Sequence, residues 1–233
     1  MLNIDSKLTT LSQSLPELWE LLTTEQQIQI APYATIKLYK KNESIHSEND
    51  NPQDLMCLID GKVKVVKEGA SRKTTIVRII NSGEYFGYRA FFSQEPYKTA
   101  AVAFSDSYVC LIPMHIICDI LKENTCLAMF FIRRLSKELG AADEKLVNLT
   151  QKHIRGRLAE ALLTLQDTYG MEDDNCTLNI YLSREDLANL SNMTASNAIR
   201  TLSNFATEKL IIIDGRRIKL IDIEGLRKIS ITG

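Results

Sequence analysis

The 233-residue sequence has no apolar run near the roughly eighteen residues that a membrane-spanning helix needs. Its first residues do not resemble a secretory signal. The five cysteines, at positions 57, 110, 118, 126 and 176, are scattered and odd in number, which argues against the disulfide framework of a secreted protein. We therefore expect a soluble, cytoplasmic protein with reduced thiols and no membrane partner.

Common enzyme signatures are also missing. The sequence has no P-loop, no nucleophile elbow, no zinc-binding spacing and no glycine run of a dinucleotide-binding fold. Its three histidines lie far apart. These absences predict that the protein is not an enzyme, and no catalytic or metal-ligating residues are assigned.

An excess of charge of one sign is missing as well. The formal net charge is −1, and from residue 152 onward eleven Lys and Arg are matched by eleven Asp and Glu. A nucleic-acid-binding segment in such a chain must gather its positive charge locally. At 233 residues the chain has room for two domains, and its 45% hydrophobic content supports a core in each.

Residues 182–202 are the most informative segment. Ser183 is a suitable N-cap for a short helix, and Asp186 completes a pair that resembles a capping box. Asn192 falls in a turn that needs a left-handed residue, and Thr194 can cap a second helix. This order predicts a helix-turn-helix, whose second helix would enter a DNA major groove.

The second helix has two unlike sides. Its buried side would consist of Ala198, Leu202 and Phe205. Small or hydrogen-bonding side chains suited to base edges occupy the other side: Ala195, Ser196, Asn197 and Arg200. An ordinary helical hairpin is the alternative, because caps and leucine spacing alone would permit it.

A two-stranded wing is predicted after this helix. Residues 209–213 are β-rich, Asp214-Gly215 is a hairpin turn signal, and residues 216–221 return with alternating apolar side chains. Basic wing residues would meet phosphates, and polar residues at the helix starts complete the predicted DNA-contacting set: Arg216, Arg217, Lys219, Ser183, Arg184 and Thr194. A solvated hairpin with surface charges is the alternative interpretation.

The first half of the chain predicts a β-rich domain. Residues 16–31 are expected to form one short helix that begins at Pro16. Strand-like runs then follow at residues 36–39, 55–59, 63–66, 75–80, 100–103 and 108–112. Turn signals separate them at residues 49–52, 60–61, 68–69 and 81–83. Short strands at regular spacing indicate a compact barrel or sandwich.

A long helix is predicted over residues 125–150. Apolar residues recur at spacings of four and three: Ala128, Ile132, Leu135, Leu139, Ala142, Leu146 and Leu149. This a/d seam is typical of a coiled coil, and the simplest partner is the same helix of a second copy. Packing against the barrel would explain the stripe but not its 3.5-residue period. A parallel homodimer would also present two reading helices to a palindromic operator.

Together these segments resemble the Crp/Fnr family of bacterial transcription regulators, over residues 16 to 220. The most specific motifs are Gly83-Glu-Tyr-Phe-Gly87, residues 144–149, Gly156-Arg-Leu-Ala159 and residues 182–202. The resemblance implies an α+β fold with three parts. These are a cyclic-nucleotide-binding-like β-barrel (jelly roll) at 1–123, a dimerisation helix at 124–151 and a winged helix-turn-helix at 152–233.

The resemblance also implies how such a protein acts. It would be a homodimeric, sequence-specific regulator of transcription that binds double-stranded DNA, with RNA polymerase as a further partner. A small effector in the barrel would reposition the DNA-binding domains through a hinge at residues 150–153. Arg200 matches the family's base-reading arginine, whose fork can grip guanine. Ser196 replaces a frequent glutamate, which allows a different half-site.

The effector predicted from this comparison is not cyclic AMP. Members that bind cyclic AMP place a glutamate after the cassette glycine and an arginine about ten residues on. Here Tyr88 follows Gly87, Lys98-Thr99 stands at the arginine position, and Ala142-Asp143 replaces the adenine-binding pair. The candidate effector-binding residues are Gly87, Tyr88, Arg89, Tyr97, Lys98, Thr99, Ala142 and Asp143.

Two alternatives stay open for the sensor domain. Tyr88 and Arg89 could fill the vacated site and leave a regulator without a ligand. A haem-dependent redox or gas sensor could use His46, His115, Met114 or a cysteine to hold iron. An iron–sulfur cluster is not expected, since no cysteine precedes Cys57. The cofactor, the target genes and the sign of regulation are not specified by the sequence.

Overall fold

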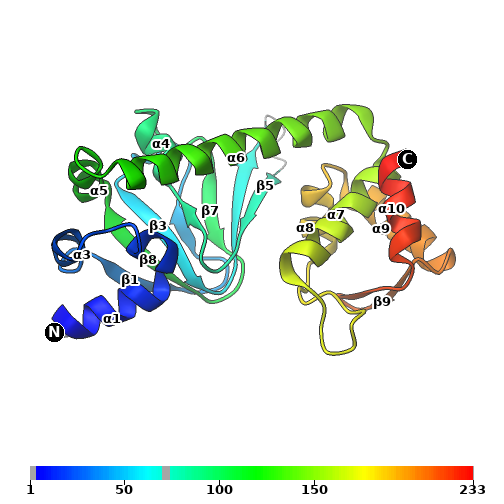
Figure 1. Cartoon of the computed structure of the whole chain (residues 1–233). Coiled ribbons are helices and arrows are strands. Elements are labelled where there is room, and N and C mark those ends of the chain that lie inside the picture. The colour runs from blue at the N-terminus through cyan, green and yellow to red at the C-terminus, as the bar shows by residue number, and fades with distance from the viewer. Residues whose placement is uncertain (1–3, 70–73, 233) are drawn as a thin grey trace. The chain divides into compact units, whose positions relative to one another are not determined.

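The computed structural model describes residues 4–69 and 74–232, which form two compact units (Figure 1). The first unit extends to Leu139, except that Thr74–Ile76 cluster with the second, which continues from Gly140. The division therefore falls within the long helix. Each unit has its own buried core.

Two four-stranded sheets form the barrel of the first unit. The first sheet has the order β1 (Thr35–Tyr39), β8 (Ser107–Pro113), β3 (Asp54–Asp60), β6 (Tyr85–Phe86). The second has the order β2 (Ser44–His46), β7 (Ala100–Ala103), β4 (Val63–Glu68), β5 (Thr74–Ile80). The pairs β1–β8, β3–β8 and β4–β7 are antiparallel. The predicted strand runs are confirmed, and the short strands β2 and β6 were missed.

Strand β3 is buried on both faces. Met56 and Leu58 join an inner cluster with residues of the second sheet, such as Val63. Leu55 and Cys57 point the other way, into an outer cluster between the first sheet and the helices. Because neither face meets water, the sequence of this strand is a continuous run of apolar residues instead of an alternation of apolar and polar ones.

Helices cover the outer face of the first sheet and supply much of the outer cluster. They are α1 (Ile4–Ser14), α2 (Pro16–Trp19), α3 (Thr24–Ile30), α5 (Met114–Leu121) and the first half of α6 (Thr125–Gln151). A short helix, α4 (Tyr88–Phe92), follows β6. The sequence did not predict α1, α4 or α5. The predicted long helix, α6, is confirmed.

The prediction of one helix over residues 16–31 is wrong. The helical conformation is interrupted between α2 and α3, because Thr23 caps a new helix with a capping box. The Gln26 amide donates to Thr23 Oγ1 (3.3 Å), and the Thr23 amide donates to Gln26 Oε1 (3.1 Å).

The second unit contains the end of α6, four further helices and a hairpin. These elements are α7 (Ile154–Tyr169), α8 (Arg184–Leu190), α9 (Ala195–Thr207), β9 (Ile211–Asp214), β10 (Arg217–Leu220) and α10 (Ile223–Thr232). Helix α10 packs on α7. The α+β class expected from the sequence is confirmed. Within residues 4–69 and 74–232, no helix combines the length and apolar character needed to cross a bilayer.

A histidine is buried at the edge of the inner cluster. The rings of His46 and Tyr97 stack with centroids 3.8 Å apart and planes 19° apart. His46 Nδ1 is buried and has no hydrogen-bond partner. Burial lowers the pKa of His46 to about 4, against smaller opposing effects of the Ser47 backbone and the Asp50 carboxylate.

This burial predicts loss of stability in mild acid. The unfolded chain takes up a proton near pH 6.5, the ordinary value for histidine, whereas the folded protein resists protonation until about pH 4. Stability from this group is therefore complete above pH 6.5 and is lost as the pH falls towards 4, by at most about 3 kcal/mol. Urea unfolding from pH 7.5 to 4.5 should show a shallower pH dependence for His46→Phe than for the parent. The exposed His115, changed to Gln, is the control; equal slopes for His46→Phe and the parent would contradict the prediction.

Candidate nucleic-acid interface

The helix-turn-helix forms as the sequence predicts. The Asp186 amide donates to Ser183 Oγ (3.0 Å), and the Ser183 hydroxyl donates to Asp186 Oδ2 (2.6 Å). Asn192 has a left-handed φ of +50°. Thr194 caps α9, since its Oγ1 accepts from the Asn197 amide (3.2 Å). Local side-chain bonds therefore set where both helices begin.

Helix α9 presents one side to solvent. Ala198, Leu202 and Phe205 are buried as expected. The exposed side carries Ala195, Ser196 and Arg200. The Arg200 guanidinium donates to Asn197 Oδ1 (3.0 Å), so Asn197 orients the arginine rather than standing apart from it. Sequence reasoning assigned both residues to bases but did not foresee this contact, although their i,i+3 spacing permits it.

Helix α7 holds α9 near both ends. The Arg155 guanidinium donates two bonds to the Glu208 carboxylate (2.8 and 2.7 Å) and lies over the Phe205 ring, 4.9 Å from its centroid. Arg157 donates to the Asn192 carbonyl (3.3 Å) in the turn before α9. Bidentate and stacked contacts fix geometry more than they add energy. These contacts were not predicted, because the partners are distant in the sequence.

The wing forms one residue later than predicted. Asp214 pairs with Arg217, so the turn consists of Gly215, with φ of +57°, and Arg216. Arg216 and Arg217 are exposed, and Arg217 lies 5.4 Å from the centroid of the Tyr181 ring. The hairpin thus carries two adjacent exposed cations close to the reading helix in sequence.

Two residues of the predicted DNA-contacting set also form bonds within the protein. Arg184 donates to the Gly215 carbonyl (2.8 Å) and so ties the start of α8 to the wing turn. Lys219 pairs with Asp174 (3.0 Å). Asp174 also accepts from the Thr177 hydroxyl (2.6 Å), and these hydrogen bonds keep its pKa well below the usual range. The structure therefore gives Arg184 and Lys219 positioning contacts that the sequence did not indicate.

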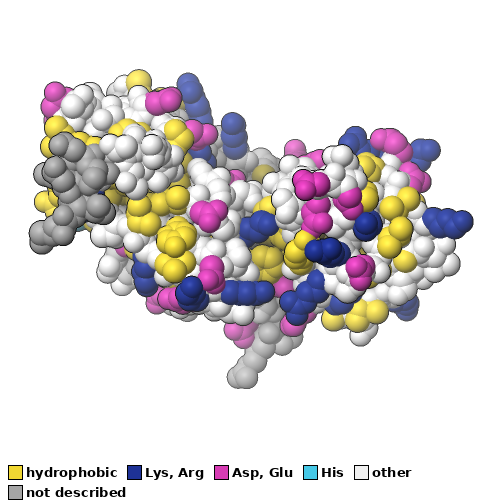
Figure 2. All heavy atoms as spheres, turned by 90° about the horizontal axis from the view of Figure 1, so that it is seen from below, with side chains coloured by type: hydrophobic (Ala, Val, Ile, Leu, Met, Phe, Trp, Pro, Cys, Tyr) yellow, Lys and Arg dark blue, Asp and Glu magenta, His cyan; other side chains and the backbone are white. Residues whose placement is uncertain are grey.

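Charges of both signs are mixed over the surface. On the face shown in Figure 2, Lys and Arg side chains are interspersed with Asp and Glu side chains. This agrees with a net charge of −1 and leaves no broad field of one sign on that face. Any affinity for an anionic partner must therefore arise from a few placed cations.

The candidate effector residues in the barrel do not converge on one space. Gly87 begins α4 with a φ of +87°. A Cβ there would lie 2.9 Å from Met56 Cε, 3.1 Å from the Asp54 carbonyl and 3.2 Å from the Tyr97 hydroxyl. The space beside the cassette glycine is thus occupied by Tyr97, which belongs to the inner cluster.

Tyr88 points into the outer cluster instead. Its hydroxyl donates to Glu138 Oε1 (2.7 Å), and its ring packs 5.3 Å from the Phe131 ring. Arg78 pairs with the same carboxylate. Burial, followed by the hydrogen bond to Glu138, raises the pKa of Tyr88. The side chain of Tyr88 is therefore part of the core of the first unit.

The remaining candidates of the sensor site are dispersed. Arg89 and Lys98 are exposed, with Lys98 3.8 Å from Glu95, and Thr99 is half-buried. Ala142 and Asp143 are exposed on the part of α6 that belongs to the second unit. Among the haem-ligand candidates, Met114 is fully buried and His115 is exposed. Within the described residues, no group of three or more His, Cys, Asp or Glu is arranged to hold a metal ion.

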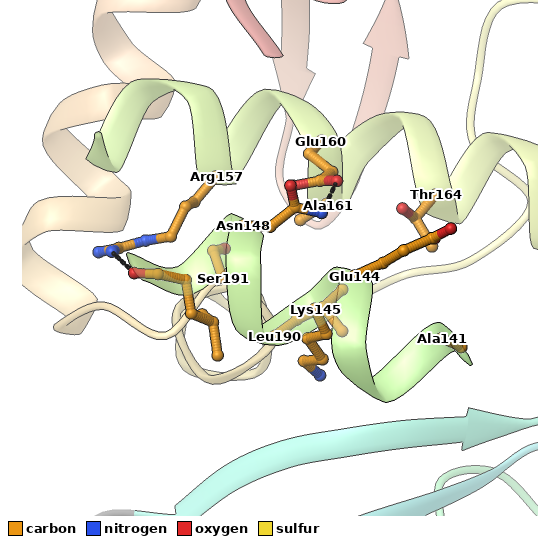
Figure 3. Close-up of a pocket in the computed structure, with 11 residues that line it drawn as sticks. Ala141, Glu144, Lys145, Asn148, Arg157, Glu160, Ala161, Thr164, Leu190 and Ser191 are labelled. Carbon is orange, nitrogen blue, oxygen red and sulfur yellow. Dashed lines mark hydrogen bonds between the residues drawn. The ribbon is translucent and has the colours of Figure 1, made fainter. Parts of the chain in front are cut away.

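A cavity of about 280 Å³ lies inside the second unit, between the end of α6, α7 and the end of α8 (Figure 3). The Asn148 amide donates to Glu160 Oε1 (2.7 Å), and Lys152 pairs with Glu160 Oε2 (3.2 Å). Arg157 donates to the Leu149 carbonyl (3.4 Å). These bonds join the last turns of α6 to α7 across the hinge that the sequence suggested. The sequence did not predict the cavity.

Two family models match this chain. The cyclic nucleotide-binding domain matches residues 36–124, and the Crp-like helix-turn-helix domain matches residues 156–229. The first covers the barrel and the second covers α7 to α10.

Characterised relatives extend over most of the chain. The transcriptional regulatory protein btr of Bordetella pertussis is 29% identical over 184 residues, which are 78% of this chain and 76% of that protein. The anaerobic regulatory protein of Bacillus subtilis is 24% identical over 206 residues, 88% of this chain and 82% of that protein.

Solved structures share the fold. A transcriptional regulator of the crp/fnr family from Eubacterium rectale superimposes with a TM-score of 0.78 at 18% identity, covering 92% of this chain and 98% of that one. FixK2 from Bradyrhizobium japonicum gives 0.75 at 22% identity, covering 84% and 97%. With the two matched domains in this order on either side of one long helix, the chain belongs to the Crp/Fnr family of transcription regulators.

Proposed function

We propose that this protein is a homodimeric, sequence-specific DNA-binding regulator whose barrel responds to a small effector other than cyclic AMP. DNA binding and transcription regulation follow from the family. The observation that supports sequence reading most directly is α9, which is held near both ends by α7 and exposes Arg200, oriented by Asn197. An arginine held in this way can donate two bonds to a guanine in the major groove.

The homodimer is supported by the exposure of the a/d seam of α6. Ile132, Leu139 and Leu146 are 51%, 64% and 62% exposed. The residues of α6 that are buried in the core of its own unit are Leu127 and Phe131, which lie outside the seam. The seam residue Leu135 is half-buried against that core, but packing on the barrel does not account for the exposed Ile132, Leu139 and Leu146. A second copy of α6 would remove these side chains from water.

The dimer proposal predicts the effect of one charge. Leu139→Lys would place an unpaired ammonium group in the seam, at a cost of several kcal/mol, and should give a monomer at micromolar concentration. Light scattering measures the mass. Gly140→Lys, beside the seam at an exposed position where a Cβ would meet nothing within 4 Å, adds the same side chain and should stay dimeric. A parent protein that is monomeric under these conditions would refute the proposal.

An effector in the barrel is supported by two buried polar atoms. The Tyr97 hydroxyl and His46 Nδ1 are both buried, lie in one stacked pair, and have no hydrogen-bond partner. Unpaired buried polar groups raise the free energy of the folded state, so a polar molecule that reached them would gain hydrogen bonds there. Tyr97 and Gly87 then mark the position of the molecule.

A regulator without a ligand is the second candidate. It is favoured by the close approach of Tyr97 to Gly87, where a Cβ would be only 3.2 Å from the hydroxyl. In this case the barrel is filled by its own side chains. Native mass spectrometry of protein purified from its own host separates the two candidates, since it reports the mass of any retained molecule, haem or metal.

Cyclic AMP should not bind. Tyr88 replaces the carboxylate that would take the ribose hydroxyl, and the exposed Lys98 does not reproduce an arginine fork. Each lost charge-assisted contact costs about 1.5–3 kcal/mol, so two losses lower affinity by about two to four decades. Calorimetry should show no heat of binding in the micromolar range, with titration of operator DNA into the same sample as the check on activity. A micromolar dissociation constant would overturn this part of the proposal.

We expect α9 to determine which bases are read and the wing to contribute affinity for DNA of any sequence. Arg200→Ala should cost about 1–3 kcal/mol and relax specificity at one base pair per half-site. Arg216→Ala should weaken binding to all sequences and flatten the salt dependence. Lys219→Ala is a matched control on the same hairpin; because Lys219 pairs with Asp174, its salt slope should change less than that of Arg216→Ala. Unchanged selectivity in Arg200→Ala would show that α9 does not read bases in this way.

A further inference from the structure

The exposed side of α9 is divided into two parallel stripes. Ser196 and Arg200, four residues apart, form a polar stripe. Ala195 and Ile199, also four residues apart, form an apolar stripe beside it. Ile199 is 50% exposed although it lies at the centre of the helix surface that carries Arg200. Sequence reasoning included Ala195 in the reading face but left Ile199 out.

Ile199 is not required by the core of the second unit. The buried side of α9 is complete without it, since Ala198, Leu202 and Phe205 are at most 1% exposed. One turn further on, the Ser203 hydroxyl donates back to the Ile199 carbonyl (3.0 Å). That bond satisfies the Ser203 hydroxyl within the helix, so this side chain is not free to cover Ile199.

The major groove offers one apolar group to such a surface. Most of the base edge consists of hydrogen-bond donors and acceptors, and its one bulky apolar group is the C5-methyl group of thymine, which 5-methylcytosine also carries. We propose that Ile199, together with Ala195, determines specificity by contacting a pyrimidine C5-methyl group beside the base pair taken by Arg200. This inference rests on the proposed function, because it requires α9 to lie in the groove.

The test removes the methyl group rather than the base pair. An operator is first enriched from random DNA with the full-length parent protein, and each thymine is then replaced by deoxyuridine, which keeps every hydrogen bond. The parent should lose about fourfold in affinity per half-site at one position, the effect of one buried methyl-sized group. Ile199→Ala should bind the thymine and deoxyuridine operators equally at that position.

A matched control separates α9 from general apolar surface. Ile212 is 51% exposed but lies on strand β9 of the wing. Ile212→Ala should retain the full thymine-to-deoxyuridine difference. If Ile212→Ala loses the difference while Ile199→Ala keeps it, the contact belongs to the wing and the assignment to Ile199 is wrong.

A second arm identifies the source of the methyl group. At the same position the base is changed to cytosine or to 5-methylcytosine, paired with guanine. Tighter binding to thymine than to deoxyuridine supports the contact and identifies thymine as its source. Tighter binding only to 5-methylcytosine than to cytosine supports the contact and identifies 5-methylcytosine as its source. Equal affinities in both comparisons overturn the proposal. Failure of the proposed function is distinguishable, because then no operator is enriched or Arg200→Ala is without effect, whereas the inference alone fails if Arg200 matters and the methyl group does not.

Discussion

Two arginines in the first turns of α7 bond the reading helix near its two ends, in addition to the packing of its buried side. A 13-residue helix such as α9 is marginal alone, and its caps only determine where it begins. Arg155 fixes its end through Glu208, and Arg157 fixes the turn before it through the Asn192 carbonyl. Each contact is partly exposed and contributes little free energy. Two contacts near opposite ends nevertheless define an orientation, and the positions of Arg200 and Ile199 both follow from it.

The parts of the site that the sequence predicted are those set by neighbours in the chain. Ser183, Asn192 and Thr194 act on residues within three positions, so their types reveal their roles. Arg184 and Lys219 find partners 31 and 45 residues away, at Gly215 and Asp174. Nothing in the local pattern distinguishes an arginine that meets phosphate from one that braces a turn. The basic wing was therefore predicted correctly as a hairpin and only partly as a charged surface.

The barrel shows the same limit at its cassette. The glycine at 87 was recognisable from the Gly83–Gly87 motif, and its left-handed φ lets β6 turn into α4 close to Met56. The sequence did not show which tyrosine would enter the space beside this glycine. Tyr88 follows the glycine directly, yet the turn sends its ring outward to Phe131, and Tyr97 returns from ten residues later to lie against Gly87. Side-chain direction after a left-handed residue is a property of the folded backbone.

Helix α6 uses one set of residues to pack in the core of the first unit and leaves another set, the seam, exposed. Leu127 and Phe131 anchor its first turns in the outer cluster, while the seam through Leu139 and Leu146 stays exposed. At its other end Asn148 bonds Glu160 on α7. The first turns of α6 therefore belong to the core of the barrel unit, and its last turns belong to the unit that contains α7. The same helix α7 carries Arg155 and Arg157, the side chains that bond the reading helix near its two ends.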